Sequence, residues 1–223
     1  MLADADWQAL LLTFRLAAVT TLLLLLVCLP VAWWLGRGRS LTRQGIAALS
    51  ALPLVLPPTV MGFYLLLLLG AHGPVAGLLG HGLAFTFTGI VIGSMLYSLP
   101  FVLQPLTNAF RAIDQDVLDA AASLGAGPFD RFCTIALPQA WPGLLSAAVL
   151  GFAHTVGEFG VVVMIGGSIP GETLVGSVQI FEYVESSRPE QAHALAAVLV
   201  AICLLLLLLV YGVEWWRGRR MAP

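Results

Sequence analysis

The feature that most constrains this chain is a series of five long apolar segments, each with at most one Asp, Glu, Lys or Arg side chain. They cover residues 10–35, 46–69, 83–110, 141–165 and 192–213. A helix needs about 20 apolar residues to cross a hydrocarbon layer of about 30 Å. Charged residues make up only 10% of the chain, against roughly 25% in an average soluble protein, so water cannot be its only solvent. We predict an all-α integral membrane protein with about five transmembrane helices.

The positions of the arginines predict the orientation of these helices. With five spans, the loops after the first and third spans lie on the same side of the membrane as the C-terminal tail. Eight of the ten basic residues fall in these three segments, namely Arg37, Arg39, Arg43, Arg111, Arg131, Arg217, Arg219 and Arg220. Arginine-rich short loops stay in the cytoplasm, which predicts a cytoplasmic C-terminus and a periplasmic N-terminus. Asp4 and Asp6 replace the basic region of a secretory signal, so we expect the first span to be permanent.

The loop of residues 111–139, on the predicted cytoplasmic side, is much longer than a connection between two spans requires. Asp114 or Asp116 can cap a short helix near its start. That helix would present an apolar face made of Val117, Leu118, Ala121 and Leu124. The glycines at positions 125 and 127 would then end it.

A second short helix is expected to follow, because Pro128 favours a first helical position. It would run to Pro138 and carry on one side Phe129, Phe132 and Ile135. Ordering such a loop costs ~1–2 kcal/mol per residue in backbone entropy, whereas ~5 residues could connect the two spans. The loop could pack as a helical hairpin on its own membrane ends, but this cost favours docking on another protein.

In this loop the sequence resembles the permease subunits of ABC importers, whose cytoplasmic "EAA" loop reads Glu-Ala-Ala, three residues, Gly, and later Ile-x-Leu-Pro. The chain has Asp119-Ala120-Ala121, then Gly125, then Ile135-Ala136-Leu137-Pro138. Its aspartate is one methylene shorter than the family's glutamate. The resemblance implies that the first short helix fits a groove on an ATPase and moves with it. The implied coupling residues are Asp119, Ala120, Ala121, Gly125, Ile135, Leu137 and Pro138.

Three further stretches are similar to the molybdate permeases of bacteria, with sulfate permeases as close relatives. They are Leu52 to Gly62, Phe152 to Gly160 and Gly166 to Thr173, although Ser168 stands where that family typically has asparagine. The resemblance implies the type I ABC importer permease fold and an inner-membrane importer of molybdate, or tungstate. A sulfate or thiosulfate importer is the alternative.

The same resemblance implies a set of partners. A second copy of the chain would complete the pore, two ATPase subunits would bind on the cytoplasmic side, and a periplasmic molybdate-binding protein would deliver the substrate. The chain has no GxxxxGKS or GxxxxGKT loop, so we expect it not to be an enzyme and to bind no cofactor. ATP and Mg²⁺ would bind to the partner ATPase. GxSxG and HExxH motifs are absent, and isolated arginines do not suit nucleic acid.

The outer loop of residues 166–191 opens with a glycine-rich turn and continues with an amphipathic segment, Thr173 to Val184. We expect a short helix at the outer interface or dipping into it. Its glutamates could meet a basic rim on the binding protein, or they could simply be solvated; they are Glu172, Glu182 and Glu185.

We expect prolines to interrupt two of the spans, at positions 53, 57 and 58 in the second and at positions 100 and 105 in the third. Each removes a backbone donor, which lipid tolerates only where protein or a cavity satisfies the freed carbonyl. Kinks made for packing could explain any one of them, but the clustering favours helices that line a pore. Pro57, Pro58 and Pro100 are therefore pore or gate candidates.

Glu158 is the only acid inside a predicted span, where a charge costs ~2.5–3.5 kcal/mol. His154 lies one helical turn earlier, so we expect a hydrogen bond between the two side chains. The pair could be a polar clasp that supports a gate, a proton relay, or a metal pair, for which two ligands are too few. Gly157 and Gly160 allow close helix approach and join the gate candidates.

A proton relay at this pair would make the chain a proton-coupled secondary transporter, but that alternative leaves the loop 111–139 unexplained.

The spans offer an oxyanion no fixed positive charge apart from Arg15. We expect weak, transient binding in the pore, helped by backbone N–H groups at broken helices.

Overall fold

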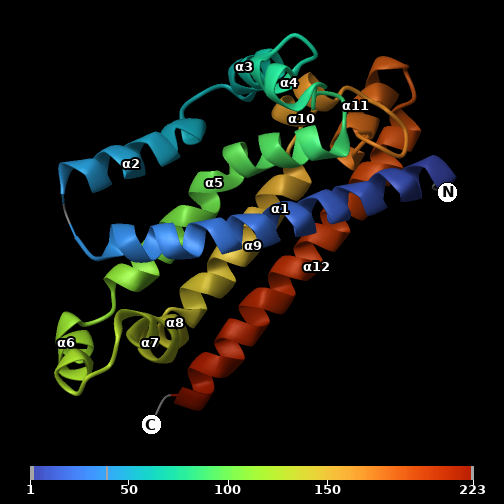
Figure 1. Ribbon diagram of the computed structural model, residues 1–223. Helices are drawn as coiled ribbons and strands as arrows, with labels where there is room; N and C mark the ends of the chain where they lie inside the picture. The colour runs from blue at the N-terminus through green and yellow to red at the C-terminus, as the bar shows by residue number, and fades with distance from the viewer. Residues whose placement is uncertain (1–2, 39, 222–223) are drawn as a thin grey trace.

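The computed structural model describes residues 3–38 and 40–221, and for residues 206, 209–211 and 213–221 it describes the backbone alone. All regular structure within these residues is helical (Figure 1). Within the described residues, three helical stretches are long and apolar enough to cross a membrane: Asp4–Gly36, Phe87–Arg111 and Pro58–Leu79, the last made of two successive helices. Trp141–Gly157, bent by 71° from Pro128–Gln139, is a fourth candidate, and a shorter apolar helix covers Pro189–Leu205. The all-α membrane architecture is confirmed.

Three helices pack together through the middle of the molecule: α1 (Asp4–Gly36), α5 (Phe87–Arg111) and α9 (Trp141–Gly157). Small residues let them approach closely. A Cβ on Gly151 of α9 would lie 2.5 Å from Val102 of α5, and Ala17 and Ala147 are fully buried. This packing also explains a correction, because α5 continues through Pro100 and Pro105, where we had expected an interruption.

The predicted second span, 46–69, is divided at its prolines. Ser40 caps α2 (Leu41–Ala51), accepting a hydrogen bond from the backbone of Arg43. A 3₁₀ turn, η1 (Leu52–Leu54), follows, and α3 (Pro58–Leu69) begins afresh with proline at its first position. Next comes the short α4 (Pro74–Leu79). Residues 55–57 therefore form a break between α2 and α3.

The predicted fourth span, 141–165, is also divided. The helix α9 ends at Gly157, and α10 (Gly160–Gly166) begins after two non-helical residues, Glu158 and Phe159, which we name the α9–α10 break. The outer loop then forms α11 (Gly176–Glu185), and α12 (Pro189–Met221) completes the chain. Of the arginines used in the orientation argument, Arg39 lies outside the described residues, and so do the side chains of Arg217, Arg219 and Arg220.

The helix α11 packs between α1 and α12 (Figure 1). The backbone N–H of Gly176 donates to Thr13 Oγ1 at 2.8 Å, and the Tyr183 hydroxyl donates to Asp6 Oδ1 at 2.7 Å. Both bonds are buried, and α11 is thus held by protein contacts. The helix begins later than predicted because Thr173 is folded into the preceding turn, where its hydroxyl donates to the carbonyl of Gly166.

The loop 111–139 folds into a compact group of short helices at the end of the molecule opposite the N-terminus (Figure 1). They are α6 (Gln115–Ser123), α7 (Pro128–Arg131), the π-helical turn η2 (Phe132–Ala136) and α8 (Leu137–Gln139). The chain passes from α8 into α9 without a loop, so this group is directly continuous with a central helix.

Candidate functional site

The two helix breaks lie next to each other. The helix α3 begins at Pro58 and α10 begins at Gly160, and the two helices pack together. A Cβ added to Gly160 would lie 2.6 Å from Cβ of Pro58. Only glycine permits this approach, so the structure brings together two of the predicted gate residues from spans far apart in sequence.

His154 does not bond to Glu158, and the predicted hydrogen bond between them is wrong. Its Nδ1 lies 2.9 Å from Ser98 Oγ on α5, and that hydroxyl is also 3.0 Å from Thr155 Oγ1. The imidazole stacks on the ring of Phe101, with the ring centroids 3.9 Å apart. His154 thus joins α9 to α5 through a hydroxyl pair and an aromatic face.

Glu158 is buried at the end of α9, with only 4% of its surface exposed. Its backbone carbonyl accepts a hydrogen bond of 2.6 Å from Ser177 of α11. Ser94 and Tyr97 of α5 lie near the carboxyl group, yet neither of its oxygens nor Ser94 Oγ has a hydrogen-bond partner among the described residues. The break therefore buries a carboxyl group beside α5.

The remaining gate candidates differ in how far they are buried. Pro57 and Gly157 are exposed, and no atom lies within 4 Å of the place that a Cβ on Gly157 would take. Pro100 is buried within α5 and borders a hollow of about 300 Å³. The gate candidates come from α5, from α9 and from the two breaks, and together we name them the band around the two breaks.

Among the described residues, no group of three or more His, Cys, Asp or Glu side chains could hold a metal ion. His154 and Glu158 lack further ligands nearby, and their side chains turn to different neighbours. The geometry at the breaks suits steric gating and helix contact.

The first short helix of the loop, α6, presents its candidate coupling residues outward. Asp114 caps it by accepting from the backbone of Asp116 at 3.0 Å. Leu118 is buried against the rest of the loop, whereas Asp119 and Ala120 are exposed. The Asp119 carboxylate accepts only a local bond from Gln115, at 2.9 Å. This face is free for a partner within the part of the chain that the structure describes.

Gly125 ends α6 in a left-handed conformation with φ +91°. The backbone N–H of Ala126 donates back to the carbonyl of Ala121, and that of Gly125 to Ala122. A residue with a Cβ is strained at this φ, although no atom lies within 4 Å of the Cβ position. The angle of the corner is thus set by backbone conformation and not by crowding.

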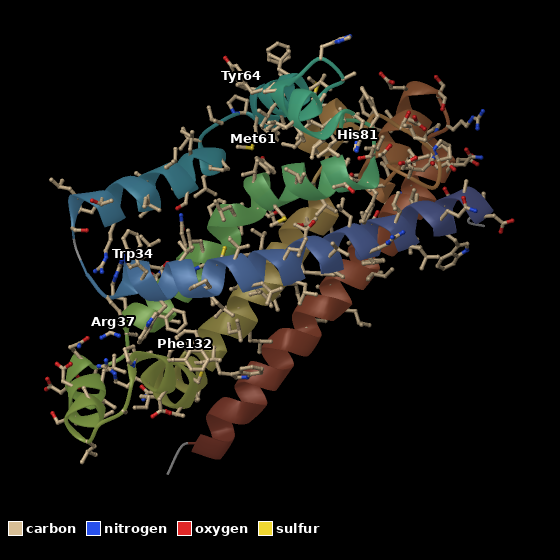
Figure 2. The ribbon with its side chains drawn as sticks, viewed as in Figure 1. Trp34, Arg37, Met61, Tyr64, His81 and Phe132 are labelled. Carbon is tan, nitrogen blue, oxygen red and sulfur yellow. The ribbon has the colours of Figure 1, made fainter. Side chains whose placement is uncertain are left out.

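The second half of the loop is anchored on α1 and α5 by three aromatic rings. Phe132 lies with its ring centroid 5.5 Å from Trp33 and 5.9 Å from Phe110, which are 5.4 Å from each other. Figure 2 shows Phe132 and Arg37 near this end of α1. The guanidinium of Arg37 covers the other side of the group, 4.5 Å from the Trp33 centroid. We name Trp33, Phe110 and Phe132 the aromatic anchor.

Two expectations for this half need correction. Phe129 does not share the anchored side, because 79% of its surface is exposed. Pro138 does not end the helix, since it occupies the first turn of α8, where a missing N–H costs little. Ile135 and Leu137 are half-buried and Pro138 is exposed, so the second group of coupling candidates lies partly beneath the surface.

Sequence reasoning missed two exposed amides, Gln104 and Asn108, which border hollows on α5. It also missed Ser98 as the partner of His154. The available signal was their position inside an apolar segment, since a polar side chain in a span seldom faces lipid.

Comparison with known proteins decides the family. Residues 28–221 match the family described as binding-protein-dependent transport system inner membrane component. The chain belongs to this permease family. It is 55% identical over 215 residues to the molybdenum transport system permease protein ModB of Azotobacter vinelandii, covering 95% of each chain. It is 31% identical to the probable sulfate transport system permease protein cysT of Anthoceros angustus, over 92% of this chain and 72% of that one.

A solved structure shares the permease fold. It is the crystal structure of a bacterial ABC transporter involved in the import of the acidic polysaccharide alginate, with a TM-score of 0.79 and 16% identity, over 99% of this chain and 81% of that one. The type I ABC importer permease fold is thus confirmed. The relatives in this family are transporter permeases and not enzymes, and the permease is a multi-pass protein of the inner membrane.

Proposed function

We propose that this permease is the transmembrane subunit of an ATP-driven ABC importer that carries molybdate across the inner membrane. The observation that carries the proposal is the 55% identity to a molybdenum transport permease along nearly the whole chain. The weaker similarity to sulfate permeases makes sulfate import the second candidate.

The group of short helices 111–139 faces the cytoplasm in this proposal, and the N-terminus faces the periplasm. Arg37 and Arg43 follow α1, and Arg111 and Arg131 flank α6, all at the same end of the molecule. The positive-inside rule assigns that end to the cytoplasm. The outer loop 166–191, with Glu172 and Glu185 exposed, then faces the binding protein.

The exposed face of α6 is the docking surface for the ATPase in this proposal. Besides Asp119 and Ala120 it is bordered by large apolar side chains that water solvates poorly, Leu124 at 90% and Phe129 at 79% exposure. Gly125 sets the angle at which α6 meets the second half of the loop. Ala121 belongs to α6, whereas Ile135, Leu137 and Pro138 belong to the second half of the loop, through which movement of an ATP-hydrolysing partner reaches α9.

The band around the two breaks is the gate in this proposal, formed by two copies of the permease. Its members are Pro57, Pro58, Pro100, His154, Gly157, Glu158 and Gly160. Helices that lack continuous hydrogen bonding at the same depth can shift their halves with little loss of backbone bonding.

Reconstitution of the complete importer tests the function. The permease is co-purified with its candidate ATPase and binding protein, placed in vesicles with ATP inside, and supplied with molybdate or sulfate outside. We expect molybdate to stimulate ATP hydrolysis and to accumulate, with sulfate much less effective. Accumulation driven by a proton gradient without the ATPase would contradict the proposal and support a secondary transporter.

A further inference from the structure

One face of α5 carries side chains that become more polar toward the end that holds α6. They are spaced three or four residues apart and therefore form one stripe, which we name the α5 stripe: Tyr97, Phe101, Gln104, Asn108 and Arg111. Tyr97 and Phe101 are half-buried against His154, whereas the last three are exposed. Neither carboxamide has a hydrogen-bond partner among the described residues.

The α5 stripe borders three adjoining hollows. The first, of about 300 Å³, lies between α5 and Leu150 of α9. The second, of about 210 Å³, lies under α2, and both are lined by Gln104 and Asn108. The third, of about 240 Å³, contains Arg43 and shares Arg111 with the second. A polar route therefore continues from Phe101 to Arg43 along one side of α5.

The polar side chains along this route can all donate hydrogen bonds, and the carboxamides can also accept them. The hydroxyls of Ser50 and Thr107 donate to carbonyls of their own helices, at 2.8 and 2.7 Å. The free donors are therefore the carboxamides of Gln104 and Asn108 and the guanidinium groups of Arg43 and Arg111. No ion pair among the described residues engages Arg43 or Arg111; Arg43 lies over the ring of Trp34, 5.0 Å from its centroid. None of the side chains that line the three hollows is acidic.

Lipid does not solvate exposed carboxamides or guanidinium groups, so this face needs a polar occupant. A tetrahedral oxyanion has acceptors only and a net negative charge. It fits a route that has donors, no acids and two unpaired cations at one end. A cation would meet the arginines as a barrier.

We propose that the α5 stripe is the cytoplasmic half of the oxyanion's path through the permease, which rests on the proposed function. Gln104 and Asn108 donate hydrogen bonds to the passing anion, and Arg111 with Arg43 attracts it toward the cytoplasm. Neutral donors placed before the charges keep binding weak enough for release. These side chains supply the contacts that we had expected from backbone N–H groups at broken helices.

Thiol labelling tests the path independently of transport. In the complete importer in vesicles, with Cys28, Cys133 and Cys203 replaced by alanine, we introduce Gln104→Cys or Asn108→Cys. An anionic sulfonate methanethiosulfonate is expected to react about tenfold faster than the cationic trimethylammonium reagent, because the arginines concentrate anions. Adding Arg111→Gln should lower this ratio to about threefold, and molybdate should slow the labelling. Leu96→Cys, in an apolar hollow on another face of α5, should remain unlabelled.

Uptake provides a second measurement in the native background. Gln104→Leu and Asn108→Leu make the span more apolar, which favours its insertion into the membrane. Each substitution is expected to lower molybdate uptake about tenfold, because the anion loses one charge-assisted hydrogen bond. Gln8→Leu, an exposed amide at the N-terminal end of α1, should have no effect.

Absence of labelling at both positions, or equal rates with both reagents, overturns the path. So does normal uptake by both leucine variants. The unsubstituted importer tests the proposed function separately: if it accumulates molybdate while the stripe fails these tests, the stripe alone is refuted. If it accumulates no oxyanion, the proposed function is refuted.

Discussion

Glu158 lies where the helical hydrogen bonding of α9 has stopped, and this explains why its side chain and that of His154 turn to different neighbours. Glu158 has φ −70° and ψ 130°, an extended conformation, whereas pairing at i and i+4 requires a helix across both residues. The spacing in the sequence was correct evidence for a shared helical face. It could not reveal that the helix ends between the two, because that end depends on the contact of Gly160 with Pro58.

Replacing Glu158 by glutamine distinguishes a structural role from a proton relay. Glu158→Gln is expected to change ATP-driven molybdate uptake by less than about twofold, because the amide has the carboxyl's shape and the Ser177 hydroxyl bonds to the backbone carbonyl of residue 158, which the substitution keeps. Uptake in vesicles is the measurement, with the exposed Asp4→Asn as the control for losing a carboxylate. Loss of uptake by an assembled Glu158→Gln importer would instead favour the relay.

At the scale of elements, prolines show how much of the fold was predictable. Those at 57 and 58 divide a span as expected, since the N-terminus of α3 needs only a first-turn position for proline. Those at 100 and 105 leave α5 intact, because α1 and α9 pack along it and hold the helix together. The sequence shows which residues weaken a helix, and the tertiary contacts decide whether it breaks.

The corner after α6 leads to a prediction about coupling. Gly125→Glu is expected to leave the permease in the membrane and ATP hydrolysis active, while uptake is lost, because a side chain at φ +91° costs about 1 kcal/mol or more and rotates α6. Both activities are measured in the reconstituted importer. Gly127→Glu is the matched control, since Gly127 has φ −68° and open space around it. Equal effects of the two substitutions would show that the added charge, not the corner, matters.

The attachment of α11 to α1 predicts a pH dependence. Burial, followed by the hydrogen bond to Asp6 and its charge, raises the pKa of Tyr183 from 10.0 to about 12. Between these values the folded protein holds a proton that the unfolded chain has lost, so the free energy of unfolding should fall as the pH rises from about 10 to 12.

Tyr183→Phe is expected to remove that component of the decline. It should also lower the free energy of unfolding near neutral pH by about 1–3 kcal/mol, because Asp6 Oδ1 loses its partner. Thermal unfolding of the purified permease measures both effects. Tyr64→Phe, on the exposed face of α3 (Figure 2), is the control, and an identical response of the two variants would contradict the prediction.

At the scale of the whole molecule, the loop 111–139 is both anchored and exposed. The aromatic anchor fixes its second half on α1 and α5, while α6 and Phe129 remain uncovered. The spacing of apolar residues predicted that Phe129 and Phe132 lie on the same side of the second short helix. The π-helical turn η2, which adds a residue to one turn, follows directly after α7 and was not detectable from residue spacing.

Two phenylalanine variants should therefore fail in different ways. Phe132→Ala is expected to destabilise the permease by on the order of 2 kcal/mol, less than the 3–5 kcal/mol of a fully buried phenylalanine, while ATPase binding persists. Phe129→Ala should leave stability unchanged and weaken co-purification with the ATPase. Unfolding and co-purification measure the two effects, and a reversed pattern would contradict the proposed docking surface.

The contact between Pro58 and Gly160 has a consequence for how motion crosses the bilayer. The helix α9 rises directly from the loop, but no helical hydrogen bonds continue through Glu158 and Phe159. A displacement arriving from below therefore cannot travel onward as the translation of a rigid rod. The outer helices α3 and α10 meet where Pro58 lies on Gly160, and α10 also packs along α5, so the motion has to reach this outer pair through side-chain contacts, and a side chain added at Gly160 would force the two helices apart.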